Sequence, residues 1–149
     1  MTDEKQAPRL TIRDYKAPAR EVTDIPWPGN AGKLVGLLCP LTVSELQAAH
    51  FEAIEYFQRK VQPNDGMSMR DFLLEEDVQE CFLFLLQPGS KRPKDRLFKD
   101  ADEARVSLDP DELRYFQDAY AHLSEVRLRA MGIWDAARTS TKRPWAEKA

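Results

Sequence analysis

The residue types that most often carry out chemistry are scarce in this 149-residue chain, which has two histidines and two cysteines. His50 lies beside the apolar positions of a predicted helix, and Ile54 stands four residues on, where a second metal ligand or an acid would be needed. His122 has similar surroundings. Cys39 and Cys81 are far apart and each lies among apolar residues, so the sequence predicts buried free thiols and not a disulfide framework or a zinc site. We expect structural or surface roles for all four residues.

The acidic stretch from Asp100 to Glu112 has the composition of a calcium-binding loop but not its order. An EF-hand loop requires acids or amides at its first, third and fifth positions and glycine at its sixth. Ala104 and Arg105 occupy the fifth and sixth positions here, and helix capping accounts for Asp109. The glycine patterns that bind phosphates and the GxSxG and HExxH motifs do not occur either. The sequence therefore predicts no catalytic residue, no metal and no cofactor.

Charge and composition restrict the class of protein further. The net charge is -3 and the isoelectric point is near 5.5, which argues against a nucleic-acid-binding protein because such proteins usually present a basic face. The basic segment Ser90–Lys99 is interpreted as a solvated loop, since acids beside it offset its charge. The first residues contain no apolar core of a signal peptide, and no apolar run reaches the roughly 20 residues of a membrane span. We expect a cytoplasmic protein with one hydrophobic core and no contact with membranes or nucleic acid.

The chain is organised around Ser68–Gln87, which is predicted to form one helix. Ser68 is a good N-cap, and Asp71 places an acid at the positive end of the helix dipole. The first half is amphipathic, with Glu75 and the neighbouring acids placed mostly away from the apolar side. The second half, Cys81–Leu86, is apolar on every side and must be surrounded by protein. Pro88 and the glycine after it are expected to end the helix.

Further elements follow from alternating apolar residues, helix caps and apolar steps of three and four residues. They are a hairpin over Val22–Leu38 with a loop at Pro26–Gly32, a helix from the capping box Thr42–Glu45 to about Gln62, a short helix at Asp100–Ser107, and a helix from Asp109 to Ala130 or Met131. The apolar stripe of the first long helix comprises Val43, Leu46, Ala49, Ala53, Phe57 and Val61. The fold class is mainly α: a small helical domain of three to four helices with a short N-terminal β-hairpin. We expect a weakly ordered lead at 1–19, a single domain at 20–134 and a mobile tail at 135–149.

Two tryptophans lie where a core cannot readily use them. Trp27 is in the proline-rich hairpin loop and Trp145 is in the predicted tail. Protein interfaces favour such residues, so both indicate a binding surface. The alternative for Trp27 is that it caps the hydrophobic core.

Three features in a fixed order resemble a known family. First, the hairpin leads into a Pro-Leu-Thr-x-x-Glu helix start at Pro40–Glu45. Second, an apolar central helix precedes a charged loop that ends in Leu97-Phe98. Third, a short acidic helix leads into Leu108–Leu113 and on to an Ala-Tyr pair at Ala119 and Tyr120. Over about residues 20–130 this layout resembles the tail assembly chaperones of long-tailed bacteriophages and related prophage elements. The long N-terminal lead and the tail after Gly132 depart from the family pattern.

The resemblance implies a non-enzymatic protein of the host cell cytoplasm. Such chaperones bind apolar helical stretches of the tape-measure protein and keep it soluble until tail-tube subunits polymerise around it, so the tape-measure protein and the tail-tube protein are the implied partners. The candidate partner-binding residues are Trp27, Phe84, Leu86, Tyr115 and Phe116, with Phe82 beside them; a purely structural role in the core is the alternative. Two other functions stay open: a structural or completion protein of the virion tail, and a small cytoplasmic adaptor unrelated to phage.

Overall fold

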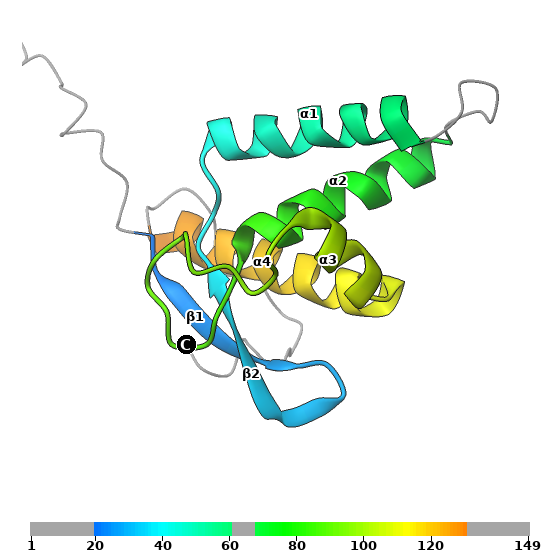
Figure 1. Ribbon diagram of the computed structural model, residues 1–149. Coiled ribbons are helices and arrows are strands. Elements are labelled where there is room, and N and C mark those ends of the chain that lie inside the picture. The colour runs from blue at the N-terminus through cyan, green and yellow to red at the C-terminus, as the bar shows by residue number, and fades with distance from the viewer. Residues whose placement is uncertain (1–19, 61–67, 131–149) are drawn as a thin grey trace, which may run out of the picture.

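The computed structural model describes residues 20–60 and 68–130 (Figure 1). In this part of the chain four helices and a three-stranded sheet follow in the order β1 (Val22–Trp27), β2 (Asn30–Leu38), α1 (Val43–Lys60), α2 (Met69–Phe84), β3 (Leu85–Leu86), α3 (Ala101–Ser107) and α4 (Pro110–Ala130). The predicted fold class, mainly α with an N-terminal hairpin, is confirmed. The predicted lead at 1–19, the predicted tail at 135–149 and Trp145 lie outside the described residues.

The hairpin has a tighter turn than the sequence predicts. Strands β1 and β2 pair antiparallel with Ile25 opposite Val35, and the pairing continues to Trp27 opposite Asn30. The turn consists of two residues, and Gly29 takes the left-handed conformation (φ 75°) that glycine adopts without steric cost. The loop expected over Pro26–Gly32 is therefore mostly strand.

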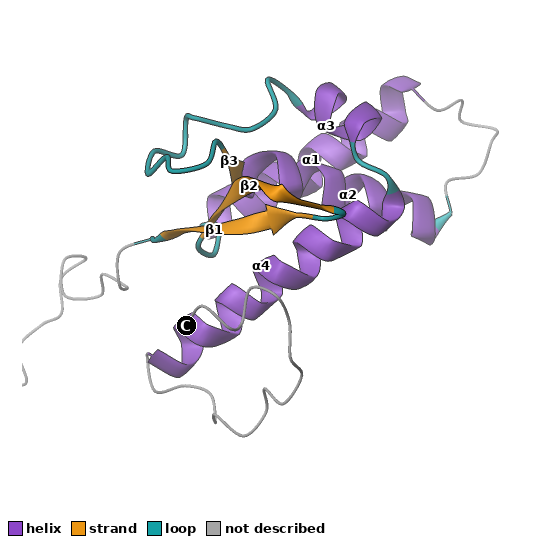
Figure 2. Ribbon diagram, turned by 90° about the horizontal axis from the view of Figure 1, so that it is seen from below, coloured by secondary structure: helices purple, strands orange, loops and turns teal. Residues whose placement is uncertain are grey.

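The central helix ends earlier than predicted, and its last two apolar residues form a strand. α2 stops at Phe84, and Leu85 and Leu86 pair antiparallel with Leu37 and Gly36 of β2. Figure 2 shows the three strands side by side, with β2 in the middle. The predicted helix to Gln87 is wrong because an extended backbone here satisfies hydrogen bonds on both sides.

The charged loop at Ser90–Lys99 forms backbone hydrogen bonds with the edge of β3 that faces away from β2. The amide of Leu97 donates to the carbonyl of Leu85 at 2.9 Å, and the amide of Gln87 donates to the carbonyl of Asp95 at 2.9 Å. Phe98 follows and is buried in the core. The end of the charged loop thus returns to the core through Leu97 and Phe98.

Gly36 lies where β1, β2 and the end of β3 come closest. A Cβ atom at this position would lie 3.2 Å from the Gln87 carbonyl oxygen and 3.2 Å from Cγ1 of Val22. Both distances are tighter than ordinary van der Waals contact. The close approach of β1, β2 and the end of β3 is possible because glycine has no side chain at this position.

The helices begin where the capping residues predict. Thr42 and Glu45 form the reciprocal capping box, with N–H···O distances of 2.8 and 3.1 Å, and Ser68 accepts from the amide of Asp71 at 3.1 Å. Asp109 accepts from the amide of Glu112 at 2.8 Å, while Glu112 accepts from the amide of Asp109 at 3.0 Å. These contacts span three residues, so the local sequence suffices to set them.

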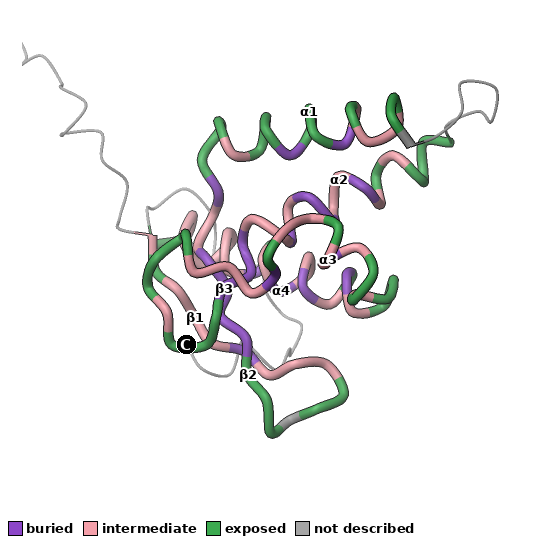
Figure 3. Tube along the Cα trace, viewed as in Figure 1, coloured by how far each residue is buried: buried purple, intermediate pink, exposed green. Residues whose placement is uncertain are grey.

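The core lies between the sheet, α2 and α4, as the buried segments in Figure 3 show. The ring of Phe84 stacks on that of Tyr120, with centroids 4.4 Å apart and planes 7° apart. The Tyr120 hydroxyl accepts a hydrogen bond of 2.6 Å from the amide of Leu41, which ties α4 to the segment before α1. No helix in the described part of the chain is long and apolar enough to cross a membrane.

Candidate protein-binding surface

The histidines and cysteines, which are the residues best suited to catalysis or metal binding, do not come together in the described part of the chain. Nδ1 of His50 lies 2.5 Å from a carboxylate oxygen of Glu76 on α2, a pair between two helices that the residues four positions apart on α1 do not indicate. His122 is buried in α4, and Cys81 is fully buried, where desolvation raises the pKa of its thiol well above the ordinary value. Cys39 is a free thiol, but the prediction that it is buried is wrong: it follows the last residue of β2 and has intermediate exposure. Among the described residues, no three His, Cys, Asp or Glu side chains are grouped as metal ligands.

Three of the five predicted partner-binding residues belong to the core. Phe84, Leu86 and Phe116 are each 0% exposed. In this conformation they stabilise the fold and present no surface to another protein. Phe82 is half-buried and lies under the guanidinium of Arg96, 5.1 Å from its ring centroid.

The other two predicted residues, Trp27 and Tyr115, join the hairpin to α4. The indole N–H of Trp27 donates to Glu112 at 2.8 Å, and its ring meets Phe116 edge to face with centroids 5.4 Å apart. The Tyr115 hydroxyl donates to the carbonyl of Pro26 at 2.9 Å. Burial raises the pKa of Tyr115. The structure favours the alternative that Trp27 caps the core.

A buried charge cluster is the main polar feature that the sequence does not reveal. Glu75, expected on the polar side of its helix, is 4% exposed and accepts hydrogen bonds from Arg105 at 2.5 and 2.8 Å and from Gln79 at 2.9 Å. Arg105 also lies over the Tyr56 ring, 4.0 Å from the centroid. Hydrogen bonding to Glu75 raises the pKa of Arg105. Glu75 and Arg105 are thirty residues apart in the chain, so the sequence does not indicate that they form a pair.

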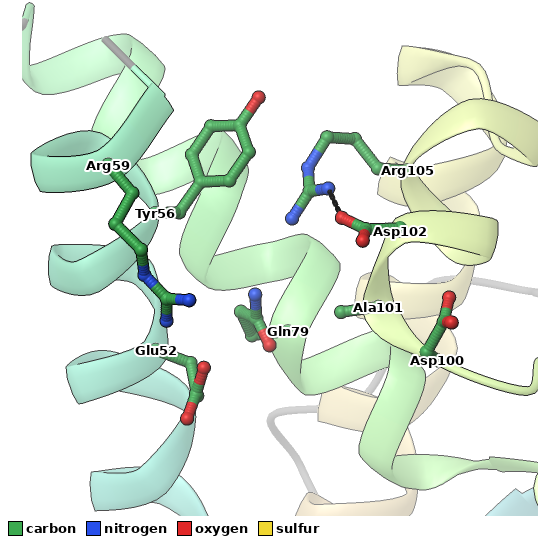
Figure 4. Close-up of a pocket in the computed structure, with 8 residues that line it drawn as sticks. All are labelled: Glu52, Tyr56, Arg59, Gln79, Asp100, Ala101, Asp102 and Arg105. Carbon is green, nitrogen blue, oxygen red and sulfur yellow. Dashed lines mark hydrogen bonds and ion pairs between the residues drawn. The ribbon is translucent and has the colours of Figure 1, made fainter.

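This cluster borders a polar pocket of about 250 Å³ between α1, α2 and α3 (Figure 4). Figure 4 shows Tyr56 and Arg59 of α1 facing Asp102 and Arg105 of α3 across the opening. Arg105 bonds Asp102 as well as Glu75, and Arg59 pairs with Glu55 at 2.6 Å. Arg105 thus joins α3 to α2 and α1, whereas the ion pair of Arg59 lies within α1.

A second and more apolar pocket of about 470 Å³ lies between the first turns of α2 and those of α4. Its apolar residues are Leu73, Leu74, Pro110 and Leu113, and its polar residues are Arg70, Asp77, Arg114 and Gln117. Burial raises the pKa of the Asp77 carboxyl, and the negative charge of Glu76 raises it further. We call this pocket the α2–α4 groove.

The exposed apolar side chains gather on α1 and the start of α2. In the described part of the chain seven large hydrophobic side chains are exposed, and five of them belong to these two helices: Val43, Leu46, Phe51, Met69 and Leu73. α1 lies along α2 at the edge of the molecule, away from the hairpin (Figure 1). We call these five side chains the α1–α2 face.

α1 contributes little to the core. Within Val43–Arg59, Ala49 and Ala53 are the buried residues, and both are small enough to let α1 approach α2 closely. Phe51 lies two positions from each of them, about 200° around the helix, and is 62% exposed. Of the predicted apolar stripe, Ala49 and Ala53 are buried, Val43 and Leu46 are exposed, and Val61 lies outside the described residues, so the stripe is only partly covered.

Comparison of the chain with protein-family models, with curated proteins and with solved structures gave no match.

Proposed function

We propose that this chain is a non-enzymatic protein-binding domain whose α1–α2 face holds an apolar helix of another protein. The observation that carries the proposal is α1 itself, an 18-residue helix that leaves Val43 71%, Leu46 40% and Phe51 62% exposed. Fully burying a side chain of this size is worth about 1.5–3 kcal/mol. A partner that covers this face therefore has a substantial source of binding free energy.

The geometry suits a helix as the bound element. α1 packs along α2 on the side of Ala49 and Ala53. The opposite side of α1, which carries Phe51, is left open, and an amphipathic helix can lay its apolar side onto it. Phe57 and Phe72 contact each other between the two helices, with ring centroids 6.2 Å apart, and His50 lies 5.5 Å from Phe72. These aromatic contacts hold α1 against α2.

Together with the family resemblance, this surface supports a specific role. We propose that the protein acts as a tail assembly chaperone that binds helical segments of a tape-measure protein and keeps them soluble before the tail tube polymerises. The protein needs no catalytic group for this role, because its contribution is to cover apolar surface and to release it when tube subunits bind more favourably.

The test is co-expression of the full chain with the tape-measure protein encoded nearest to its gene, followed by affinity purification and measurement of soluble tape-measure protein. We expect co-purification and increased solubility. Phe51→Ser should weaken both, whereas Val106→Ser, which changes a side chain 83% exposed on α3, should weaken neither. Urea unfolding should show that both variants are as stable as the parent to within about 0.5 kcal/mol.

Other results would point to the other functions. Stable incorporation of the chain into finished tails would indicate a structural or completion protein. Failure to bind or solubilise the tape-measure protein would refute the chaperone role and leave an adaptor for a different partner.

A further inference from the structure

The α2–α4 groove combines an apolar floor with two arginines. Leu73, Leu74 and Leu113 supply the apolar surface, and Arg70 and Arg114, both exposed, stand beside it. Its volume of about 470 Å³ lies within the range of pockets that bind ligands or anchoring side chains.

The two arginines are not explained by the fold. Within residues 20–60 and 68–130, neither Arg70 nor Arg114 has a carboxylate within 4.0 Å, whereas Arg20, Arg59, Arg92 and Arg105 each have one. Asp77 lines the same groove, but its carboxyl contacts neither guanidinium, and the pKa of that carboxyl is raised by burial and by Glu76.

The positions of the arginines along their helices strengthen this point. Arg70 is the second residue of α2, within the first turn, and Arg114 is the fifth residue of α4. A cation in the first turn of a helix faces the positive end of the dipole, which destabilises the helix slightly. Arg70 therefore does not serve helix stability, unlike Asp71 in the same turn, and its guanidinium can donate charge-assisted hydrogen bonds to an anionic partner.

We propose that the α2–α4 groove binds an acidic amphipathic helix, which inserts an apolar side chain between Leu73 and Leu113 and pairs carboxylates with Arg70 and Arg114. This rests on the proposed function, and it specifies the chemistry of the partner: an apolar anchor with aspartate or glutamate three or four residues away, on the same side of the helix. Leu73 belongs to both the groove and the α1–α2 face, so the two surfaces are adjacent. The groove adds two arginines that select for a negatively charged partner.

The test uses the full chain and three labelled helical peptides of identical length and identical leucine positions. The flanking positions of the three peptides are all glutamate, all glutamine or all lysine, and binding is measured by fluorescence anisotropy at low and high salt. Two exposed ion pairs predict that the glutamate peptide binds about threefold to tenfold more tightly than the glutamine peptide. The advantage should shrink at high salt.

Charge reversal separates this inference from effects on folding. The variant Arg70→Glu/Arg114→Glu should prefer the lysine peptide to the glutamate peptide, and circular dichroism should show that the variant keeps the helical content of the parent chain. The matched control Arg59→Glu changes an exposed arginine of α1 outside the groove and should keep the preference of the parent chain.

Equal binding of all three peptides, unchanged by charge reversal in the groove, would overturn the acidic-partner inference and leave the apolar-helix function standing. A preference that Arg59→Glu alters as much as the groove variant does would also overturn it, because the selectivity would then come from overall charge. If the tape-measure protein co-purifies but no peptide binds, the groove is not the docking site. Failure of the co-purification itself counts against the proposed function, and the two failures are thus distinguishable.

Discussion

Replacing Arg105 by methionine tests whether the buried ion pair holds α3 against α2. The substitution keeps an unbranched side chain but removes both hydrogen bonds that Arg105 donates to Glu75, at 2.8 and 2.5 Å. Glu75 is 4% exposed, so its carboxylate would be left in the interior with the 2.9 Å hydrogen bond from Gln79 as its remaining contact.

The expected cost follows from that stranded charge. Removing one partner of a buried ion pair typically destabilises a protein by about 3–5 kcal/mol. Arg105 is itself 21% exposed, so we expect the lower end, about 3 kcal/mol, including the lost contact with the Tyr56 ring. The free energy of unfolding is measured by urea titration, followed by far-ultraviolet circular dichroism.

A double-mutant cycle and an internal control make the result specific. Glu75→Met/Arg105→Met removes both charges and should return to within about 1 kcal/mol of the parent chain, because no unpaired charge stays buried. The exposed pair Glu55–Arg59, whose side chains are 54% and 68% exposed, is the matched control, and Arg59→Met should cost less than about 0.5 kcal/mol. If Arg105→Met costs no more than Arg59→Met, the buried pair does not hold the fold together and our reasoning is wrong.

Three further predictions concern the sheet, the hydrogen bond between Leu41 and Tyr120, and the groove. Gly36→Ala should lower the free energy of unfolding by about 1–3 kcal/mol because its methyl group meets two atoms at 3.2 Å, while Gly32→Ala, with its nearest neighbour at 3.9 Å, should change it little in the same urea titration. Tyr120→Phe should cost about 1–2 kcal/mol, since the amide of Leu41 loses its 2.6 Å acceptor, and hydrogen exchange should show faster exchange at that amide. Asp77→Asn should raise stability at pH 7: an acid whose folded pKa is raised disfavours folding as pH rises through that pKa, so the gain should vanish as the pH falls toward 4, and stability–pH curves that stay parallel would contradict this.

The surroundings of Trp27 differ from the exposed position that the sequence indicates. The contacts of its indole with Glu112 and Phe116 are internal, so its first role is to hold β1 and β2 onto α4. Glu112 serves two purposes, capping α4 through one oxygen and accepting from the indole through the other. A tryptophan in a proline-rich loop looks exposed in the sequence because its partner lies 85 residues away.

Local contacts were determined by the sequence alone. The starts of α1, α2, α3 and α4 follow from Thr42, Ser68, Asp100 and Asp109, whose side chains each accept from an amide three residues on. Such contacts do not depend on the rest of the fold. The fold class could therefore be predicted from caps and apolar periodicity.

Only the tertiary structure decided how the remaining apolar and charged residues are used. Leu85 and Leu86 continue a helical pattern, yet they form a strand because β2 and the loop at Asp95–Leu97 offer hydrogen-bond partners on both sides. Glu75 is buried because Arg105 arrives from thirty residues away to neutralise it. The candidate site follows the same rule: whether Phe51 or Phe84 faces solvent depends on which helices pack against it, and this is set by the whole fold and not by the residue or its neighbours in the chain.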